Sequence, residues 1–284
     1  AHNISPDTLD RDDCDDEYTV DIEDLDATYR FCQDDPGFIP SLLEDMVEER
    51  YELKGRLSGM AEDSQEARDL DTRQNALKIL SNAFYGYMGY NGARWYSREC
   101  AEATTALGRR YIQDTIEAAE EMGFDVVYGD TDSVMLKGGD VEDRLDGFQA
   151  EVNADLPEFM ELEFEGFYPR GLFTYTEQGE GAKKKYALID RGGDVKITGF
   201  EQVRRDWSPV AKEVQEEVIR QVLEGDVDAA VETVEDTIER LRAGEVPLEK
   251  LRIYTKMTKK PENYESKTPH SEAAKKAIKR GEEI

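Results

Sequence analysis

The sequence predicts a mixed α/β fold of the α+β kind, in which a long helical hairpin precedes short antiparallel strands and a mostly helical C-terminal part. The helical hairpin is predicted because apolar residues recur at helical spacing in residues 42–57 and 72–85, with a polar link between them. The strands are predicted because β-branched residues flank tight turns at residues 129–132 and 191–194. With 284 residues, the chain is long enough for one large domain or two to three small ones.

The first helix of the hairpin follows an acidic segment that contains β-prone pieces at residues 18–20 and 29–31. Ser41 is a good N-cap for this helix, and Glu44 completes a capping box with it. We therefore expect the helix to begin at Ser41.

The second helix of the hairpin is expected to begin at Asp71 or Thr72, after a polar link that starts at Ser58. It is expected to end at the run of glycines that starts with Gly86. Two antiparallel helices joined by a short polar turn are the simplest arrangement.

The rest of the chain alternates between helices and short strands. The expected elements are a helix from Ser97 to Met122, a β-hairpin of residues 124–128 and 133–136, a helix at 141–156, a strand at 162–168, paired strands at 185–190 and 195–199, and a helix from Ser208 to about Leu241. No apolar run approaches the roughly 18–20 residues that a membrane-spanning helix needs. We therefore expect no membrane partner.

The charge of the chain is strongly acidic. Asp and Glu number 65 against 36 Lys and Arg, which gives a formal net charge of −29. Taken as a whole, this charge argues against a nucleic-acid partner, because phosphate binding uses positive surface. The local distribution of the cations has to be considered before that class is excluded.

Cysteine and histidine are too few for several kinds of chemistry. Cys14, Cys32 and Cys100 are odd in number, widely spaced and without a CxxC pair, so we expect no disulfide framework and a reducing cytoplasm. His2 and His270 are the two histidines, which nearly excludes a His-based zinc site or a Ser-His-Asp triad. Metal chemistry would rest on carboxylates, which favour hard ions such as Mg²⁺.

Asp130 and Asp132 stand at the turn of the expected hairpin. Two carboxylates two residues apart can point at one place, where they repel each other unless a cation neutralises them. Such pairs hold divalent ions in enzymes that carry out displacement at phosphorus. A plain surface turn is the alternative in so acidic a chain, although apolar residues on both sides favour a buried hairpin. An EF-hand is excluded, because Val134 stands where that loop needs an oxygen ligand.

Polar side chains also follow the long helices. A cation, two amides and a tyrosine stand four, four and three residues apart on the second helix, and so share one face: Gln74, Lys78, Asn82 and Tyr85. Arg50 and Lys54 share a face of the first helix. Cations that face each other across the hairpin would form a basic slot for a triphosphate, whereas a solvated polar stripe is the alternative.

Other cations cluster in three islands that are interleaved with Tyr and Trp. They are Lys183-Lys184-Lys185-Tyr186, Arg204-Arg205-Asp206-Trp207, and residues 252–260 with Lys256, Lys259 and Lys260. Each island alone is usually solvated surface. Together they suit contacts to a nucleic-acid backbone.

Several of these segments resemble the motifs of family B DNA-directed DNA polymerases. Residues 128–133 resemble the YxDTDS palm signature, and residues 78–86 are similar to the fingers motif KxxxNSxYG, with Ala83 in place of Ser. Lys184-Lys185-Tyr186 resembles the KxY element that grips the primer–template. Further segments look like archaeal members of the family, and order and spacing agree along the whole chain: residues 38–43, 94–96 and 203–207.

The resemblance implies a right-hand polymerase fragment with helical-hairpin fingers, an antiparallel β palm with helices, and a partial, mostly helical thumb. Residues 1–38 would be a palm segment that follows a missing first catalytic motif. Residues 39–91 would be the fingers, residues 92–180 the palm with the Asp-Thr-Asp hairpin, and residues 181–284 the palm–thumb junction and partial thumb.

The resemblance also implies roles for individual residues. Asp132 and Asp130 would be catalytic and lie at the metal site, with Asp130 as an outer partner or alternate ligand. Glu163 and Glu165 match palm glutamates that can touch a further ion. The cofactor would be two Mg²⁺ ions, with Mn²⁺ as a substitute, and the reaction would be attack of a primer 3′-hydroxyl on the α-phosphorus of a deoxynucleotide.

The binding residues follow from the same resemblance. Arg50 and Lys78 would hold the incoming triphosphate with Lys54 nearby, and Asn82 and Tyr85 would line the nascent base pair. The expected DNA contacts are Lys184, Lys185, Tyr186, Arg204, Arg205, Lys256, Lys259 and Lys260. The partners would be primer–template DNA, deoxynucleoside triphosphates and a sliding clamp reached through parts outside this chain.

One departure from the family pattern bears on activity. The family carries another catalytic Asp in a D-x-x-S-L-Y-P-S motif, which immediately precedes a segment like Ala1–Leu9. We therefore expect a fragment that starts after this motif, lacks the exonuclease and stops within the thumb at Ile284, and that has no polymerase activity alone. A non-catalytic DNA-binding remnant, or one subunit of a split polymerase, is the alternative, and an acidic helical interaction protein is a distant third.

The net charge indicates that the protein works in concentrated salt. Spread acidity keeps a protein hydrated in concentrated salt, and salt screens the repulsion between an acidic surface and DNA. We therefore expect a halophilic archaeal source, a cytoplasmic location, and a fold that loosens when salt is removed.

Overall fold

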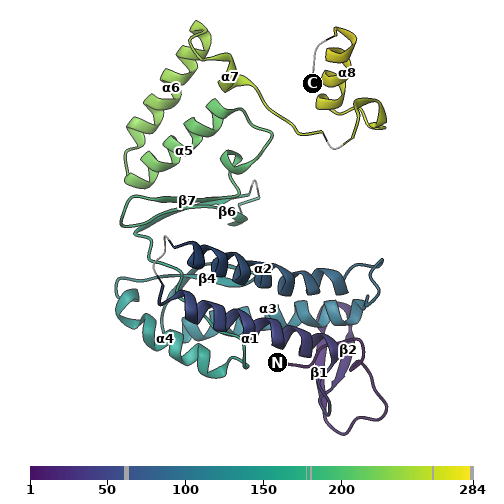
Figure 1. Cartoon of the computed structure of the whole chain (residues 1–284). Helices are drawn as coiled ribbons and strands as arrows, with labels where there is room; N and C mark the ends of the chain where they lie inside the picture. The colour runs from purple at the N-terminus through teal and green to yellow at the C-terminus, as the bar shows by residue number, and fades with distance from the viewer. Residues whose placement is uncertain (61–63, 177, 180, 258, 282–284) are drawn as a thin grey trace. The chain divides into compact units, whose positions relative to one another are not determined.

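The computed structural model describes the chain except for residues 61–63, 177, 180, 258 and 282–284 (Figure 1). The chain divides into two compact units, Ala1–Phe164 and Glu165–Ile284, which are described separately. Among the described residues, none of the helices combines the length and the apolar character that crossing a membrane needs.

In the residues that the structure describes, the first unit contains two β-hairpins and four long helices. In chain order these are β1 (Glu17–Ile22), a 3₁₀ turn (Glu23–Leu25), β2 (Ala27–Cys32), α1 (Phe38–Leu57), α2 (Gln65–Met88), α3 (Arg98–Glu121), β3 (Asp125–Asp130), β4 (Ser133–Lys137) and α4 (Val141–Asp155). Strands β1 and β2 form one antiparallel pair and β3 and β4 another. The expected hairpin around residues 129–132 and the helices at 97–122 and 141–156 are confirmed.

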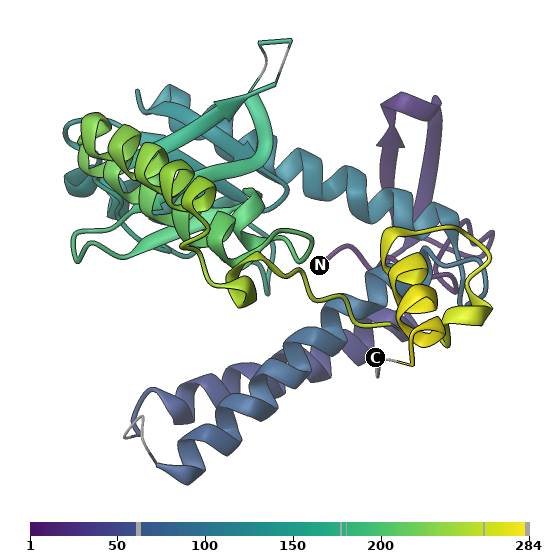
Figure 2. The same cartoon turned by 90° about the horizontal axis from the view of Figure 1, so that it is seen from above.

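Helices α1 and α2 pack side by side as an antiparallel hairpin (Figures 1 and 2). Leu53 of α1 and Ala67 and Leu70 of α2 are buried in it. The expected helical hairpin is confirmed, but α2 begins at Gln65 and not at Asp71. The side chain of Ser64 caps it by accepting a hydrogen bond from the Ala67 N–H, and the buried residues of the first two turns hold the earlier start in place.

The expected start of α1 at Ser41 is also wrong. The helix begins at Phe38, and Ser41 lies inside it, where its hydroxyl donates to the Gly37 carbonyl oxygen at 2.9 Å. Two N–H groups of the first turn donate to side chains that lie more than 30 residues earlier in the chain. Phe38 N–H donates to Asp7 at 3.0 Å, and Ile39 N–H donates to Ser5 Oγ at 3.3 Å. A capping rule that looks only at neighbouring residues cannot find such caps.

Asp7 is suited to this position. Partial burial acts to raise its pKa, but hydrogen bonds from the Ser5 hydroxyl and the Phe38 N–H lower the pKa below the ordinary value. The carboxylate is therefore ionised at the positive end of α1, where negative charge is stabilised.

Two apolar clusters hold the first unit together. One joins the β1–β2 hairpin to α1, α2 and α3 through Phe31, Ile39, Met88 and Leu107 among others. The other packs α3 and α4 against the β3–β4 hairpin through Ala119, Phe124, Phe148 and Val152. The second cluster fixes the hairpin that carries the two aspartates.

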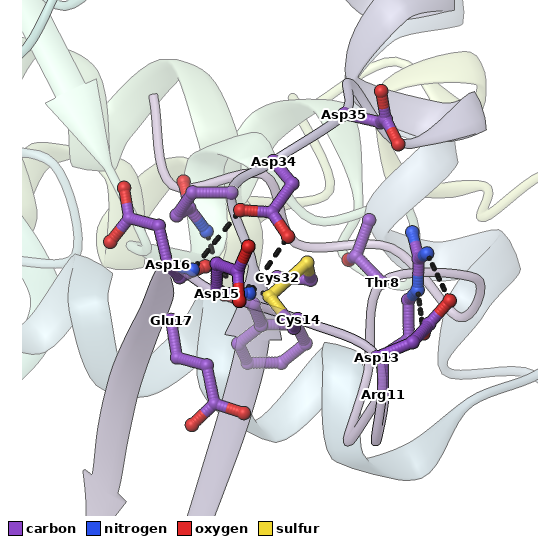
Figure 3. Close-up of a disulfide and its surroundings, with 12 residues drawn as sticks. Thr8, Arg11, Asp13, Cys14, Asp15, Asp16, Glu17, Cys32, Asp34 and Asp35 are labelled. Atoms are coloured by element: carbon purple, nitrogen blue, oxygen red, sulfur yellow. Dashed lines mark hydrogen bonds and ion pairs between the residues drawn. A yellow bond between two sulfur atoms is a disulfide. The ribbon is translucent and has the colours of Figure 1, made fainter.

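A disulfide contradicts the expectation from the cysteine count. Cys14 and Cys32 are bonded, and Cys100 is the free, buried cysteine, whose pKa burial raises to about 11 (Figure 3). The pairing of β1 with β2 sets Glu17 opposite Cys32 and so brings the nearby Cys14 to it, although the two cysteines are 18 residues apart. Cysteine usage therefore gives no support for a reducing compartment.

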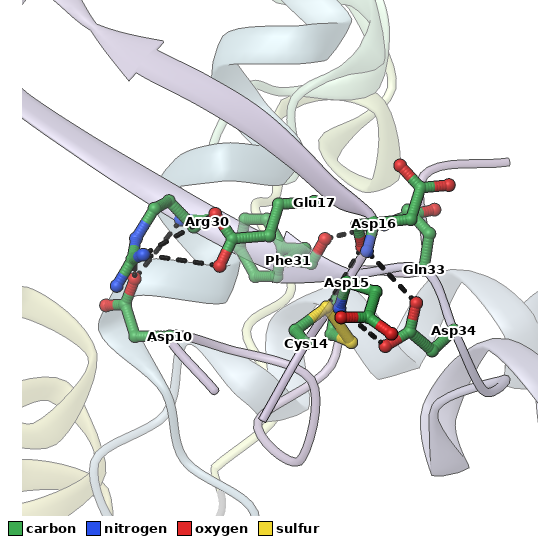
Figure 4. A network of polar contacts seen from close by, with 10 residues as sticks. Asp10, Cys14, Asp15, Asp16, Glu17, Arg30, Phe31, Gln33 and Asp34 are labelled. Atoms are coloured by element: carbon green, nitrogen blue, oxygen red, sulfur yellow. Dashed lines mark hydrogen bonds and ion pairs between the residues drawn. A yellow bond between two sulfur atoms is a disulfide. The ribbon is translucent and has the colours of Figure 1, made fainter. Parts of the chain in front are cut away.

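Polar contacts around the disulfide fix the loop that precedes β1. The Asp34 carboxylate accepts the N–H groups of Asp15 at 2.9 Å and Asp16 at 3.0 Å (Figures 3 and 4). Arg30 of β2 bridges Glu17 at 3.2 Å and Asp10 at 3.4 Å (Figure 4). The acidic N-terminal segment is therefore ordered by its own carboxylates.

The second unit is a three-stranded sheet followed by helices. Its elements are β5 (Arg170–Tyr175), β6 (Gly181–Ile189), β7 (Val195–Thr198), the 3₁₀ turn η2 (Glu201–Val203), α5 (Pro209–Glu224), α6 (Val227–Ala243), α7 (Leu248–Leu251), η3 (Pro261–Asn263) and α8 (Pro269–Lys279). The sheet is antiparallel in the order β5-β6-β7, and Ile219 and Leu223 of α5 pack on it. The expected strand pair around residues 191–194 is confirmed.

Two expectations for residues 162–241 are corrected. Residues 162–168 form no strand, because the Leu162 backbone is bonded to side chains of α4: its N–H donates to Asn153 at 2.7 Å and its carbonyl accepts from Gln149 at 2.7 Å. The single helix expected from Ser208 is two helices. Gly225, with φ of 91°, ends α5, and Asp226 caps α6.

Candidate active site

The two aspartates lie at the tip of the β3–β4 hairpin. Asp130, the last residue of β3, pairs with Ser133, which leaves Thr131 and Asp132 as a two-residue turn. Thr131 has a φ of 29°, and its hydroxyl donates to the Asp130 carboxylate at 3.0 Å. The turn therefore presents two carboxylates, one half-buried and one exposed.

The hairpin is less buried than expected. Val126 packs against the apolar cluster beneath it, but Val127 is 43% exposed and Asp132 lies at the surface. Only one face of the hairpin meets α3 and α4, so the apolar residues on the other face remain accessible. The expected buried hairpin is therefore only partly confirmed, because it packs on the apolar cluster through residues such as Val126 and Leu136 while its tip is accessible.

Gly129 sets the distance between the hairpin and α3. A β-carbon on Gly129 would lie 3.0 Å from Ile116 Cδ1 of α3, which is closer than almost all real contacts of this kind. A residue with a side chain at this place would have to displace Ile116 or lift the strand. Gly129 therefore fixes the position of the neighbouring Asp130, a role that the motif alone does not reveal.

The donor chemistry at the turn suits a hard divalent cation. Mg²⁺ is commonly held by one or two carboxylates, with water and substrate phosphate completing its shell, and Asp130 and Asp132 supply two carboxylates. Among the described residues, the one group of three His, Cys or acidic side chains with ligand atoms within 4.8 Å of one another is Cys14, Cys32 and Asp34. Its two sulfurs are bonded to each other, so this group is not a thiolate site.

The expected palm glutamates have separate partners. Glu163 belongs to the first unit and forms an ion pair with Lys54 of α1 at 3.2 Å. Glu165 belongs to the second unit and forms an ion pair with Lys196 of β7, whose pKa this hydrogen bond raises. Neither glutamate lies on a strand.

The helical hairpin presents its polar residues in two ways. Arg50 is half-buried, and its Nε donates to Gln74 at 3.4 Å, which links α1 to α2. Lys78 and Asn82 are exposed, and neither side chain has a hydrogen bond or ion pair within the described part of the chain. Tyr85 is 49% exposed and shares a hydrogen bond of 3.0 Å with Thr105 of α3. The expected basic slot is partial, since Lys54 is neutralised by Glu163.

Two of the cations in the basic islands of the second unit are bound to acidic side chains, which the sequence does not indicate. Arg204 is held by two hydrogen bonds of 3.0 and 2.7 Å to Asp206, and Lys185 donates to Glu201 at 2.9 Å. Arg205 is exposed, as are Lys256, Lys259 and Lys260, which lie outside helices and strands. Sequence reasoning missed Glu201, although it lies just before the Arg204-Arg205 pair and could have been noticed there.

Both the structure and the sequence of this chain are similar to those of known DNA polymerases. The structure superposes over its full length on 36% of a family B DNA polymerase from the hyperthermophilic archaeon Pyrobaculum calidifontis, with a TM-score of 0.70 and 35% identity. The fold is therefore that of a mixed α/β segment of a family B polymerase. The sequence also matches DNA polymerase family B over residues 1–284, and the chain belongs to this family.

Curated relatives agree along the whole chain. A DNA polymerase of Thermococcus gorgonarius is 46% identical over 291 aligned residues, which cover 100% of this chain and 36% of the relative. A DNA polymerase of Archaeoglobus fulgidus is 40% identical, with 99% of this chain and 34% of the relative covered. The chain thus spans about a third of the length of the relatives it matches.

Proposed function

We propose that this chain supplies the fingers, part of the palm and part of the thumb of a DNA-directed DNA polymerase. The proposal depends first on the family match over residues 1–284. It is supported by two carboxylates at one hairpin turn and by Lys78 on α2, an exposed cation without an ion pair among the described residues. The expected subdomain limits at residues 38, 91 and 180 are part of this proposal.

Asp130 and Asp132 act at the reacting phosphate. They would hold the two Mg²⁺ ions, or Mn²⁺ in their place. These ions would lower the pKa of the primer 3′-hydroxyl and neutralise charge on the phosphates. The turn contributes rigid placement, because Gly129 seats the strand on α3 and Thr131 orients the Asp130 carboxylate. Glu163 and Glu165 are proposed as outer carboxylates for a further ion.

The fingers helix acts on the incoming nucleotide. Lys78 has no competing carboxylate among the described residues, so its ammonium is available to a triphosphate. Arg50 is anchored by Gln74 and would approach the same phosphates, while Lys54 would have to leave Glu163 to do so. Asn82 and Tyr85 would line the nascent base pair, Tyr85 being steadied by Thr105.

The second unit would hold the primer–template. The proposed contacts lie in three basic runs, and they are Lys184, Tyr186, Arg204, Arg205, Lys256, Lys259 and Lys260, with Lys185 in the first of these runs. Binding to a sliding clamp through other parts of the protein, a cytoplasmic location and a halophilic archaeal source complete the proposal. The net charge of −29 supports the last of these.

Primer extension tests the proposal. We expect the 284-residue chain to extend no primer alone, because Asp130 and Asp132 have no third carboxylate beside them in its described part. Adding the polymerase segment that carries the D-x-x-S-L-Y-P-S motif should restore Mg²⁺-dependent extension. Extension by the chain alone would contradict the expected inactivity, and no extension after addition of the segment would favour a non-catalytic remnant.

A further inference from the structure

The basic run of β6 lies in a wide β-bulge. Gly181 pairs with Tyr175, and Tyr186 pairs with Phe173. Four residues of β6, 182–185, therefore stand opposite the single Thr174. Bulges re-aim side chains and leave residues outside the ladder, so the direction of these lysines depends on what holds the bulge.

Lys185, within the bulge, is tied inward through both its side chain and its backbone. Its ammonium donates to Glu201 Oε1 at 2.9 Å and lies 5.2 Å from the centre of the Phe200 ring. Its carbonyl oxygen accepts a hydrogen bond from the Thr174 hydroxyl at 3.0 Å. The neighbouring Lys184 is exposed, with a φ of 56°.

Glu201 is held in turn by α5. Its second oxygen accepts a hydrogen bond from Gln215 at 2.9 Å, so both carboxylate oxygens are used. The side chains of Lys185 and Glu201 are 34% and 22% exposed, which shields the pair from full solvent screening. The hydrogen bond from Lys185, followed by that from Gln215, lowers the pKa of Glu201 to about 2.

We propose that Glu201 is a positioning residue for binding of the primer–template backbone. Through Lys185 it fixes the β6 bulge so that Lys184 meets phosphate, while Lys185 serves as an internal tie and not as a phosphate contact. This inference rests on the proposed function, because it assigns separate tasks to two lysines of the proposed DNA-binding run.

The direction in which removal of the Glu201 charge changes the DNA affinity distinguishes a positioning role from a purely electrostatic one. Removing an acidic group near a phosphate-binding surface should strengthen DNA binding if charge alone matters, because Lys185 would be released to the DNA. The salt dependence would then steepen by about 0.9 in the slope of log K against log salt. If Glu201 positions the bulge, the same substitution weakens binding in spite of the lost negative charge.

The experiment measures the affinity of the full chain for a fluorescein-labelled primer–template duplex by anisotropy over a series of KCl concentrations. We expect Glu201→Gln to bind about tenfold more weakly, as the loss of one coupled charged pair allows. Lys185→Arg should keep near-wild-type affinity, since arginine can still pair with Glu201. Glu213→Gln is the matched control, because Glu213 lies on α5 and pairs with Lys250 away from the bulge.

Amide hydrogen exchange supplies a second readout. Residues 181–186 should exchange faster in Glu201→Gln than in the wild type, with unchanged exchange in α6. Equal or tighter DNA binding by Glu201→Gln, or unchanged exchange in the bulge, would overturn the positioning role. A wild-type chain that does not bind the duplex at all would overturn the proposed function itself, and the role of Glu201 with it.

Discussion

A β-carbon on Gly199 would lie 1.7 Å from the Lys184 carbonyl oxygen, so the end of β7 and the bulge of β6 meet backbone to backbone. Gly199 also has a φ of 72°, a conformation that L side chains rarely adopt. This close approach limits where the Lys184 backbone can lie, in addition to the side-chain contacts of the bulge.

Gly199→Ala should therefore destabilise the second unit by more than backbone strain alone. The positive φ costs about 1 kcal/mol, and the displacement of the Lys184 backbone should add about 2 kcal/mol. Gly244→Ala is the matched control, because Gly244 has a φ of 73° and a β-carbon added there would have nothing within 4 Å. Thermal unfolding of both variants measures the difference, and equal losses would show that the contact is unimportant.

Acid should weaken the tie between Glu201 and Lys185. The pKa of Glu201 falls from 4.5 to about 2 in the folded chain, chiefly through the hydrogen bond from Lys185. A lowered folded pKa stabilises the fold above the unfolded value, and this stabilisation is lost as pH falls from about 4.5 toward 2. The difference in unfolding free energy between wild type and Glu201→Gln should therefore be constant above that range and shrink within it.

Denaturant titrations at a series of pH values measure that difference. Lys185→Met should make the unfolding free energy depend less on pH in the same range, because it removes the main cause of the lowered Glu201 pKa. A difference that does not change with pH would mean that the carboxylate gains nothing from its partners.

Lys78→Met should impair use of the incoming nucleotide by the assembled polymerase. A charged hydrogen bond to phosphate contributes about 1.5–3 kcal/mol, which corresponds to a loss of roughly 10- to 100-fold in kcat/KM. Steady-state primer extension against deoxynucleotide concentration measures this loss. Arg68→Met, an exposed cation on the same helix, is the control. Equal effects of the two substitutions would argue against a specific triphosphate contact.

Salt should stabilise the chain. The net charge of −29 is spread over a largely exposed acidic surface, and molar salt shortens the Debye length to about 3 Å. We expect the melting temperature to rise by roughly 5 °C between low and multimolar KCl, as about 2 kcal/mol would produce in a chain of this size. Sucrose at equal osmolarity separates screening from solute exclusion. An unchanged melting temperature in KCl would contradict the halophilic assignment.

Much of the fold follows from local sequence patterns. The periodicity of α1 and α2, the Ser97 cap of α3 and the turn residues of the β3–β4 and β6–β7 hairpins act over a few positions. The errors arose where distant residues decide the outcome. Asp7 caps α1 from 31 residues away, and Asn153 takes the backbone of Leu162 out of any strand.

The candidate site was predictable to a different degree. The identity of Asp130, Asp132 and Lys78 follows from motif and spacing, because those features are carried by the residues themselves. Their ion-pair environment does not, since Glu163 reaches Lys54 across 109 positions and Glu201 reaches Lys185 across 16. Cys14 and Cys32 show the same limit, because only the register of β1 and β2 brings them together.

The role of the hairpin aspartates is the central claim, and one substitution tests it most directly. Asp132→Asn should abolish Mg²⁺-dependent primer extension by the assembled polymerase, while Asp125→Asn, at the exposed start of the same hairpin, should leave it nearly unchanged. The substitution keeps the size of the side chain and removes its charge, so binding of the primer–template should persist. Extension by Asp132→Asn at the wild-type rate would contradict the account.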